Sequence, residues 1–161
     1  MSWLRVAVTE RQKRGRLYGL PLFLSFSYRD KGVRIGADTS TLKFTETSTQ
    51  VNGFKQHKFN TWQVTGEYDV TSNFTVAAQY VDNAAGTCEL NGPISCSTVG
   101  LGGNLVGFGA KYNLDRNFAL FALVAKGSAN SGAVISLGSG AGRTAIGGTI
   151  NAAAVGIQAR F

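Results

Sequence analysis

The chain has 161 residues, the size of one domain, and only 16% of them are charged. Its 21 glycines stand beside 2 prolines, which excludes a collagen or polyproline chain. The same glycines argue against long helices, because each interior glycine costs up to about 1 kcal/mol. A helical membrane protein is also excluded, since the sequence contains no run of about 18 apolar residues.

The net charge is +7, from 16 Lys and Arg against 9 Asp and Glu. This excess permits an anionic partner, such as nucleic acid, lipopolysaccharide or a small anion. The basic residues are scattered, apart from a cluster formed by Arg11, Lys13, Arg14 and Arg16. No nucleic-acid-binding motif accompanies this cluster, so we interpret it as a solvated turn and expect no nucleic-acid partner.

A first strand is expected at residues 2–8, and residues 1–16 otherwise have no clear interpretation. The start does not resemble a signal peptide, because Arg5 interrupts its apolar residues and Glu10 follows them. If the protein is exported, its signal is either lost from this chain or encoded upstream of Met1.

From Leu20 onward, apolar and polar residues alternate with a period of two, which is typical of strands. No segment indicates a helix. About eight strands are expected, at 2–8, 19–29, 32–39, 57–69, 73–82, 104–114, 117–126 and 148–161.

The connections between these strands are of two kinds. The short ones, 69–73 and 113–117, are rich in turn residues and predict tight hairpins. The long ones, 39–55, 83–103 and 127–148, consist mainly of Gly, Ser, Thr, Asn and Ala. Short and long connections alternate along the chain, which is typical of an up-and-down β-barrel in an outer membrane.

The alternation divides the strand residues into two sets. An apolar, aromatic-rich set is expected to face outward, because a lysine or arginine facing lipid at mid-bilayer costs about 2–4 kcal/mol. This set contains Trp62, Val64, Tyr68, Phe74, Val76, Tyr80, Val106, Phe108 and Tyr112. The polar set is expected to line a lumen and contains Arg29, Arg34, Thr61, Gln63, Thr65, Glu67, Gln79, Lys111 and Arg160.

In a wide barrel the charged members of the polar set would line a water-filled pore and favour anions. In a narrow barrel they would instead fill the interior and form ion pairs, for example with Glu67 and Asp69. A soluble β-sandwich would show the same alternation. Against the sandwich stand the aromatic residues near strand ends, the length of the strands, and the small residues Gly107, Gly109, Ala154 and Gly156 on the polar face.

Cys88 and Cys96 lie eight residues apart in a polar connection. In an oxidising compartment this spacing predicts a disulfide in an external loop, and two free thiols are the alternative. The only histidine, His57, is interpreted as a solvated loop residue. We find no catalytic constellation, cofactor motif or set of metal ligands, so neither an enzyme nor a bound cofactor or metal is expected.

Two segments resemble hairpins of a known family. They are VTGEYDVTSNFTVAAQYVDN, beginning at Val64, and GFGAKYNLDRNFALFALVAK, beginning at Gly107. Both resemble the Gram-negative general porins of the trimeric β-proteobacterial type. The ending AAVGIQARF resembles the closing strand of that family, in which the terminal residue, here Phe161, is the signal read by the outer-membrane assembly machinery.

The resemblance covers Leu20 to Phe161 and implies a single all-β domain, residues 1–161, forming an antiparallel transmembrane β-barrel. It implies an outer-membrane location, with lipid, lipopolysaccharide and the assembly machinery as partners and a homotrimer as a candidate assembly. The implied function is passive diffusion of small hydrophilic solutes with a weak preference for anions.

The chain also departs from that family, whose members have sixteen strands and about twice this length. Only their C-terminal half is matched, so the acidic residues of their constriction loop cannot be carried over. Either these eight strands close into a small barrel, or the chain is part of a longer porin. Two alternative functions stay open: a non-conducting eight-stranded barrel with a structural or adhesion role, and a soluble β-sandwich binding module.

Overall fold

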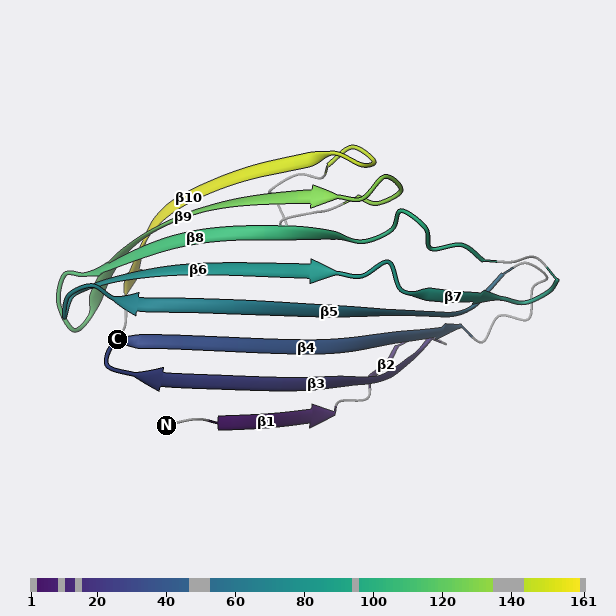
Figure 1. Ribbon diagram of the computed structural model, residues 1–161, viewed down its shortest axis with the longest axis horizontal. Coiled ribbons are helices and arrows are strands. Elements are labelled where there is room, and N and C mark those ends of the chain that lie inside the picture. Colours follow the sequence, from purple (N-terminus) through teal and green to yellow (C-terminus); the bar gives the residue numbers. More distant parts are fainter. Residues whose placement is uncertain are drawn as a thin grey trace.

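The computed structural model shows an all-β fold (Figure 1) and describes residues 3–8, 11–13, 16–46, 53–93, 96–134 and 144–159. The strands are β1 (Trp3–Val8), β2 (Arg11–Lys13), β3 (Arg16–Asp30), β4 (Val33–Glu46), β5 (Phe54–Asp69), β6 (Phe74–Asn83), β7 (Thr87–Leu90), β8 (Gly103–Asn113), β9 (Phe118–Ala129) and β10 (Thr149–Ala159). No described helix is long and apolar enough to cross a membrane.

The strands form one antiparallel sheet in the order β1-β3-β4-β5-β6-β8-β9-β10. The two short strands lie off this path, with β2 paired to β3 and β7 paired to β5. Figure 1 shows the short turns gathered at one end of the sheet and the long connections at the other. The edge strands β1 and β10 are not paired with each other, so the described strands form an open sheet and not a small closed barrel.

Three tight turns join neighbouring strands at the same end of the sheet. Between β3 and β4, Lys31 and Gly32 both adopt positive φ angles, 41° and 83°, as a two-residue hairpin loop of the I′ type requires. The other two turns share one design. Thr71 Oγ1 accepts hydrogen bonds from the backbone amides of Asn73 and Phe74, and Asp115 Oδ1 accepts them from Asn117 and Phe118.

Two of the predicted long connections are wrong in their bounds. β4 continues to Glu46 and β5 begins at Phe54, so most of the expected connection 39–55 is strand. β7 lies inside the expected connection 83–103, where His57 of β5 pairs with Cys88. In this part of β4 only Leu42 and Phe44 alternate with polar residues, and β7 has four residues, so the hydrophobic alternation is weak. The segments are strands because a neighbouring strand pairs with them.

Candidate functional site

From β5 to β10, one face of the sheet carries an apolar band of constant width. The cross-strand register places apolar residues opposite one another, for example Val64 opposite Tyr80 and Phe108 opposite Val124. On each of five strands in succession the band spans seven residues, at 62–68, 74–80, 106–112, 118–124 and 153–159. All nine residues of the predicted outward set lie on this face.

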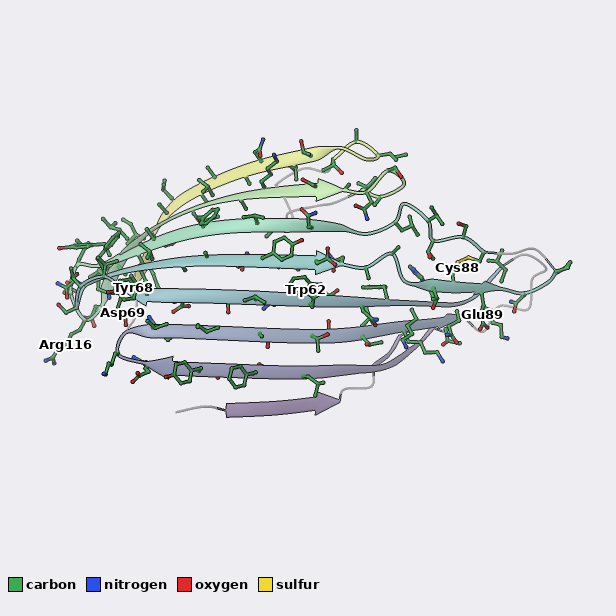
Figure 2. All side chains as sticks on the ribbon, viewed as in Figure 1. Trp62, Tyr68, Asp69, Cys88, Glu89 and Arg116 are labelled. Atoms are coloured by element: carbon green, nitrogen blue, oxygen red, sulfur yellow. A yellow bond between two sulfur atoms is a disulfide. The ribbon has the colours of Figure 1, made fainter. Side chains whose placement is uncertain are left out.

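Aromatic side chains stand at both margins of the apolar band. Tyr68, Phe74, Tyr112 and Phe118 lie beside the short turns. At the opposite margin the rings of Trp62 and Tyr80 lie 5.1 Å apart between centroids. Figure 2 shows Tyr68 at the turn end of β5 and Trp62 farther along the same strand. Beyond that second margin the same face becomes polar, at Asn60, Asp82, Asn104, Lys126 and Asn151.

The band is inclined to the strands, because the short turns are displaced along them. Val33 at the first turn pairs with Tyr68, two residues before Val70 at the second turn. Phe74 at the second turn pairs with Tyr112, which likewise lies two residues before the third turn. From one short turn to the next, the strand ends shift by two residues, or about 6.6 Å along the strands, while the sheet advances by two interstrand spacings of about 4.8 Å each. The strands are therefore tilted by roughly 35° from the perpendicular to a line drawn through the short turns.

No second layer of described residues covers the apolar band. Val155 is 84% exposed and Phe108 is 58% exposed. Among the described residues, only Ala119 and Ala133 are buried hydrophobic side chains. A sheet with one apolar face needs an apolar partner, and the described residues supply none.

The opposite face carries the predicted polar set. The register places Arg29 opposite Arg34, Arg34 opposite Glu67, and Thr65 opposite Gln79. Thr61, Gln63 and Lys111 lie on the same face, whereas Arg160 and Phe161 lie outside the described residues.

Ion pairs and hydrogen bonds link these polar side chains sideways, from strand to strand. Arg34 binds two carboxylates of β5, with Nε 3.0 Å from Glu67 Oε2 and Nη2 2.8 Å from Asp69 Oδ1. Thr75 Oγ1 donates a further bond of 2.7 Å to Asp69 Oδ1. Gln63 Nε2 donates to Asp38 Oδ2 at 3.1 Å. These side chains therefore lie across the polar face of the sheet, each bonded to a side chain on an adjacent strand.

The charges on this face are balanced. From Ser25 onward, and level with the apolar band, the described side chains comprise three cations and three carboxylates: Arg29, Arg34 and Lys111 against Asp38, Glu67 and Asp69. Two of those carboxylates bind Arg34. This part of the polar face therefore has strong local dipoles and no formal net charge.

The polar face is hollowed by two adjoining grooves. One, of about 440 Å³, is lined by residues that include Arg29, Arg34, Thr65 and Glu67. The other, of about 250 Å³, shares Thr65 and Glu67 and continues over Gly107 and Gly109 to Leu123. Together they connect the charged side chains of β3 to β5 with the small residues of β8.

The sequence did not reveal that this face becomes apolar toward β9 and β10. Phe121 and Leu123 lie on it, as their pairing with Gly156 and Ala154 requires. Some glycines of this face also lack free space beside them, because a Cβ atom added to Gly107 would lie 3.1 Å from Gln79 Cγ. The sequence does contain a signal for this apolar part, because the residues from Phe118 to Ala125 are all apolar and a strand of such residues is apolar on both faces.

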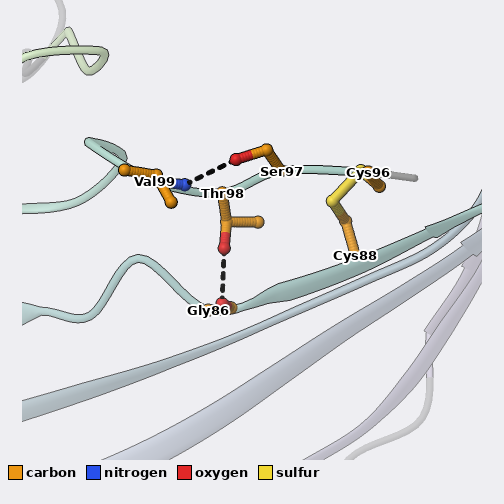
Figure 3. The surroundings of a disulfide bond; sticks show 6 residues. All are labelled: Gly86, Cys88, Cys96, Ser97, Thr98 and Val99. Atoms are coloured by element: carbon orange, nitrogen blue, oxygen red, sulfur yellow. Dashed lines mark hydrogen bonds between the residues drawn. A yellow bond between two sulfur atoms is a disulfide. The ribbon is translucent and has the colours of Figure 1, made fainter.

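A disulfide staples the connection after β6 at the long-loop end of the sheet (Figure 3). Cys88 in β7 bonds to Cys96, with Cα atoms 5.7 Å apart, within the range that disulfides occupy. Thr98 Oγ1 donates a hydrogen bond of 2.7 Å to the carbonyl oxygen of Gly86. Nearby, Lys55 and Glu89 form an ion pair with a 3.3 Å contact.

The interpretation of His57 as a solvated loop residue is wrong. His57 lies inside β5, half-buried, with its ring centroid 5.6 Å from that of Phe59. Its Nε2 atom is buried and has no hydrogen-bond partner among the described residues. The described part of the chain contains no group of three or more His, Cys, Asp or Glu side chains placed to hold a metal ion.

Compared with known protein families, curated proteins and solved structures, the chain matches none.

Proposed function

We propose that this chain forms the wall of an outer-membrane β-barrel through which small hydrophilic solutes diffuse passively, with a weak preference for anions. The observation that carries the proposal is the inclined apolar band, seven residues wide on five consecutive strands and bordered by aromatic rings. A planar slab of lipid imposes a constant width of this kind.

The dimensions of the band support a lipid environment. Seven residues span about 20 Å along a strand, or about 16 Å along the normal for strands inclined by roughly 35°. The aromatic rings at both margins extend this height toward the ~25 Å apolar band of outer-membrane barrels. The inclination itself falls at the lower limit of the ~35–45° tilt that barrel strands adopt.

The same band argues against a soluble β-sandwich. A sandwich buries its apolar face against a second sheet about 10 Å away. The described strands instead form a single sheet, in which Phe108, Val124 and Val155 are exposed.

Closing this wall in lipid requires partners for its two edges, because each unsatisfied backbone group there costs several kcal/mol. The path has eight strands that alternate in direction, so β1 and β10 run antiparallel. They are therefore suited to pair with each other or with further strands. Small wall residues such as Gly109 and Ala154 favour a wide barrel, because the interior of an eight-stranded barrel must be filled by side chains.

The proposed mechanism involves no chemistry and no cofactor. Hydroxyl, amide and charged groups along the two grooves replace part of the hydration shell of a passing solute. Because carboxylates neutralise Arg34, the wall discriminates little by charge. Arg160, which the sequence alternation places on the same face as Gln158, adds one positive charge to the six balanced charges of this face and supplies the anion preference.

Conductance across planar lipid bilayers tests this function. We expect stepwise conductance from detergent-solubilised, folded protein, with a small reversal potential in a KCl gradient that indicates anion preference. A folded protein that inserts without conductance would support the non-conducting barrel. A protein that stays monomeric and folded without detergent would support the soluble sandwich and defeat the proposal.

A further inference from the structure

The face that the proposed function places in water carries a patch of exposed apolar side chains on β9. Phe121 lies on this face, opposite Lys111 in the register. Leu123 lies on it as well, opposite Gly109. Phe121 is 37% exposed and Leu123 is 41% exposed, and Ala125 continues the patch along the strand. These three residues, the β9 patch, give the polar face an apolar surface that hydrophilic solutes do not use.

The β9 patch borders a shallow pit in the polar face. The floor of the pit consists of Ala77 and Gly109, which are direct cross-strand partners. A Cβ atom added to Gly109 would have its nearest contacts at 3.6 Å and 4.0 Å, so the floor is open to a solute. Leu123 forms one side of the pit and Glu67 forms the other. The groove of about 250 Å³ that includes these four residues is smaller than the ~300–1,000 Å³ of drug-sized sites, so it suits a small solute.

One end of the pit carries a cation. Lys111 lies on the same face two residues beyond Gly109, toward the short turns, and is half-buried. None of the described ion pairs or side-chain hydrogen bonds includes its ammonium group. Glu67 and Asp69, the carboxylates of β5 in the same cross-strand rows, already bind Arg34. The ammonium group is therefore available to an anion that enters the pit.

The cation and the β9 patch are immediate neighbours. Lys111 and Phe121 are direct cross-strand partners, and such residues have Cβ atoms about 5 Å apart. Apolar side chains beside the ammonium group exclude water from part of its surroundings, which strengthens its attraction for an anion. An apolar group above Gly109 would in turn cover Leu123 and remove apolar surface from water.

We infer that the pit binds a small monocarboxylate with an apolar body. Its carboxylate binds Lys111, and its body lies over Gly109 against Phe121 and Leu123. This inference rests on the proposed function, which makes this face the wall of the solute path, and it names the class of solute that the wall retains. A polar anion uses the cation alone, and a neutral apolar solute uses the β9 patch alone. A monocarboxylate with an apolar body uses both.

The test measures the affinity of cyclohexanecarboxylate for the folded protein in dodecylmaltoside micelles by saturation-transfer NMR, with protein-free micelles as the background. We expect Lys111→Gln to bind about fivefold more weakly and Lys111→Arg to bind like the parent protein. Leu123→Ser should weaken binding by about threefold, because it removes apolar contact. Lys126→Gln is the matched control and should bind like the parent protein, because Lys126 pairs with Val106 on the opposite face.

Two further ligands test the two halves of the site on the parent protein. Glucuronate has the same charge on a ring that carries hydroxyl groups, and cyclohexylmethanol has the apolar ring without the charge. Both should bind at least about fivefold more weakly than cyclohexanecarboxylate.

Equal affinity for either of these ligands would overturn the inference, as would unchanged affinity in Lys111→Gln or Leu123→Ser. If a variant fails to fold, the ligand comparison on the parent protein decides. Failure of the proposed function looks different, since the folded protein would then bind cyclohexanecarboxylate in micelles and show no stepwise conductance in planar bilayers.

Discussion

The ring of Phe121 on β9 covers Gly156, its direct cross-strand partner on β10. A Cβ atom added to Gly156 would come within 2.5 Å of Phe121 Cζ and 2.8 Å of Cε1. An aromatic ring lying over a glycine on the neighbouring strand shields backbone that has no side chain of its own. This contact fastens the edge strand β10 to the rest of the sheet.

The first prediction concerns that contact. Gly156→Ala should destabilise the folded protein by about 1–3 kcal/mol, because the ring must leave its position over the backbone. Gly66→Ala is the matched control, since a Cβ there would meet nothing within 4 Å. Urea unfolding followed by heat-modifiable gel migration measures both variants, and equal destabilisation of the two would contradict the proposed packing.

The second prediction tests which face meets lipid. Ala77 and Ala78 are adjacent in β6 near the middle of the apolar band, on opposite faces. Ala78→Lys should lose about 2–4 kcal/mol in lipid, because its ammonium group faces the hydrocarbon. Ala77→Lys should fold, because it places the ammonium opposite Glu67. Folding yields in phosphatidylcholine vesicles measure the difference, and the reverse order would exchange the two faces.

The third prediction concerns ion selectivity. Arg34→Gln removes the cation shared by Glu67 and Asp69, so the wall becomes net negative and the channel should shift toward cations by about twofold or more. Glu67→Gln should shift selectivity toward anions for the converse reason. Reversal potentials in a KCl gradient measure both, and shifts of the same sign would show that these side chains do not face the permeation path.

The fourth prediction concerns the disulfide. Removing it with Cys88→Ser and Cys96→Ser should release about 2.5 kcal/mol of loop constraint, estimated from chain entropy for a loop of about eight residues. The effect should stay local, because β5 is the one described strand with which β7 pairs. Limited proteolysis should cut between Leu90 and Val99 faster, with heat-modifiable migration unchanged. Two titratable thiols in the unreduced parent protein would disprove the bond.

The sequence by itself determined the strands of the band and their two faces. Successive side chains of a strand point to opposite sides, so alternation at Trp62 to Asp69 or Phe74 to Tyr80 assigns each residue to a face without knowledge of its partners. The turn residues around Thr71 and Asp115 act within four residues of chain and are readable for the same reason. The Cys88–Cys96 pairing is also local, across a separation of eight residues.

The tertiary structure decided what depends on register between strands. The inclination of the band, the two carboxylates on Arg34, the ring of Phe121 over Gly156 and the opposition of Ala77 and Gly109 all join residues far apart in the chain. Sliding one strand by two residues preserves every inward and outward assignment yet replaces each of these partners. Periodicity therefore specifies the faces of this sheet, whereas long-range backbone pairing specifies which side chains meet on them.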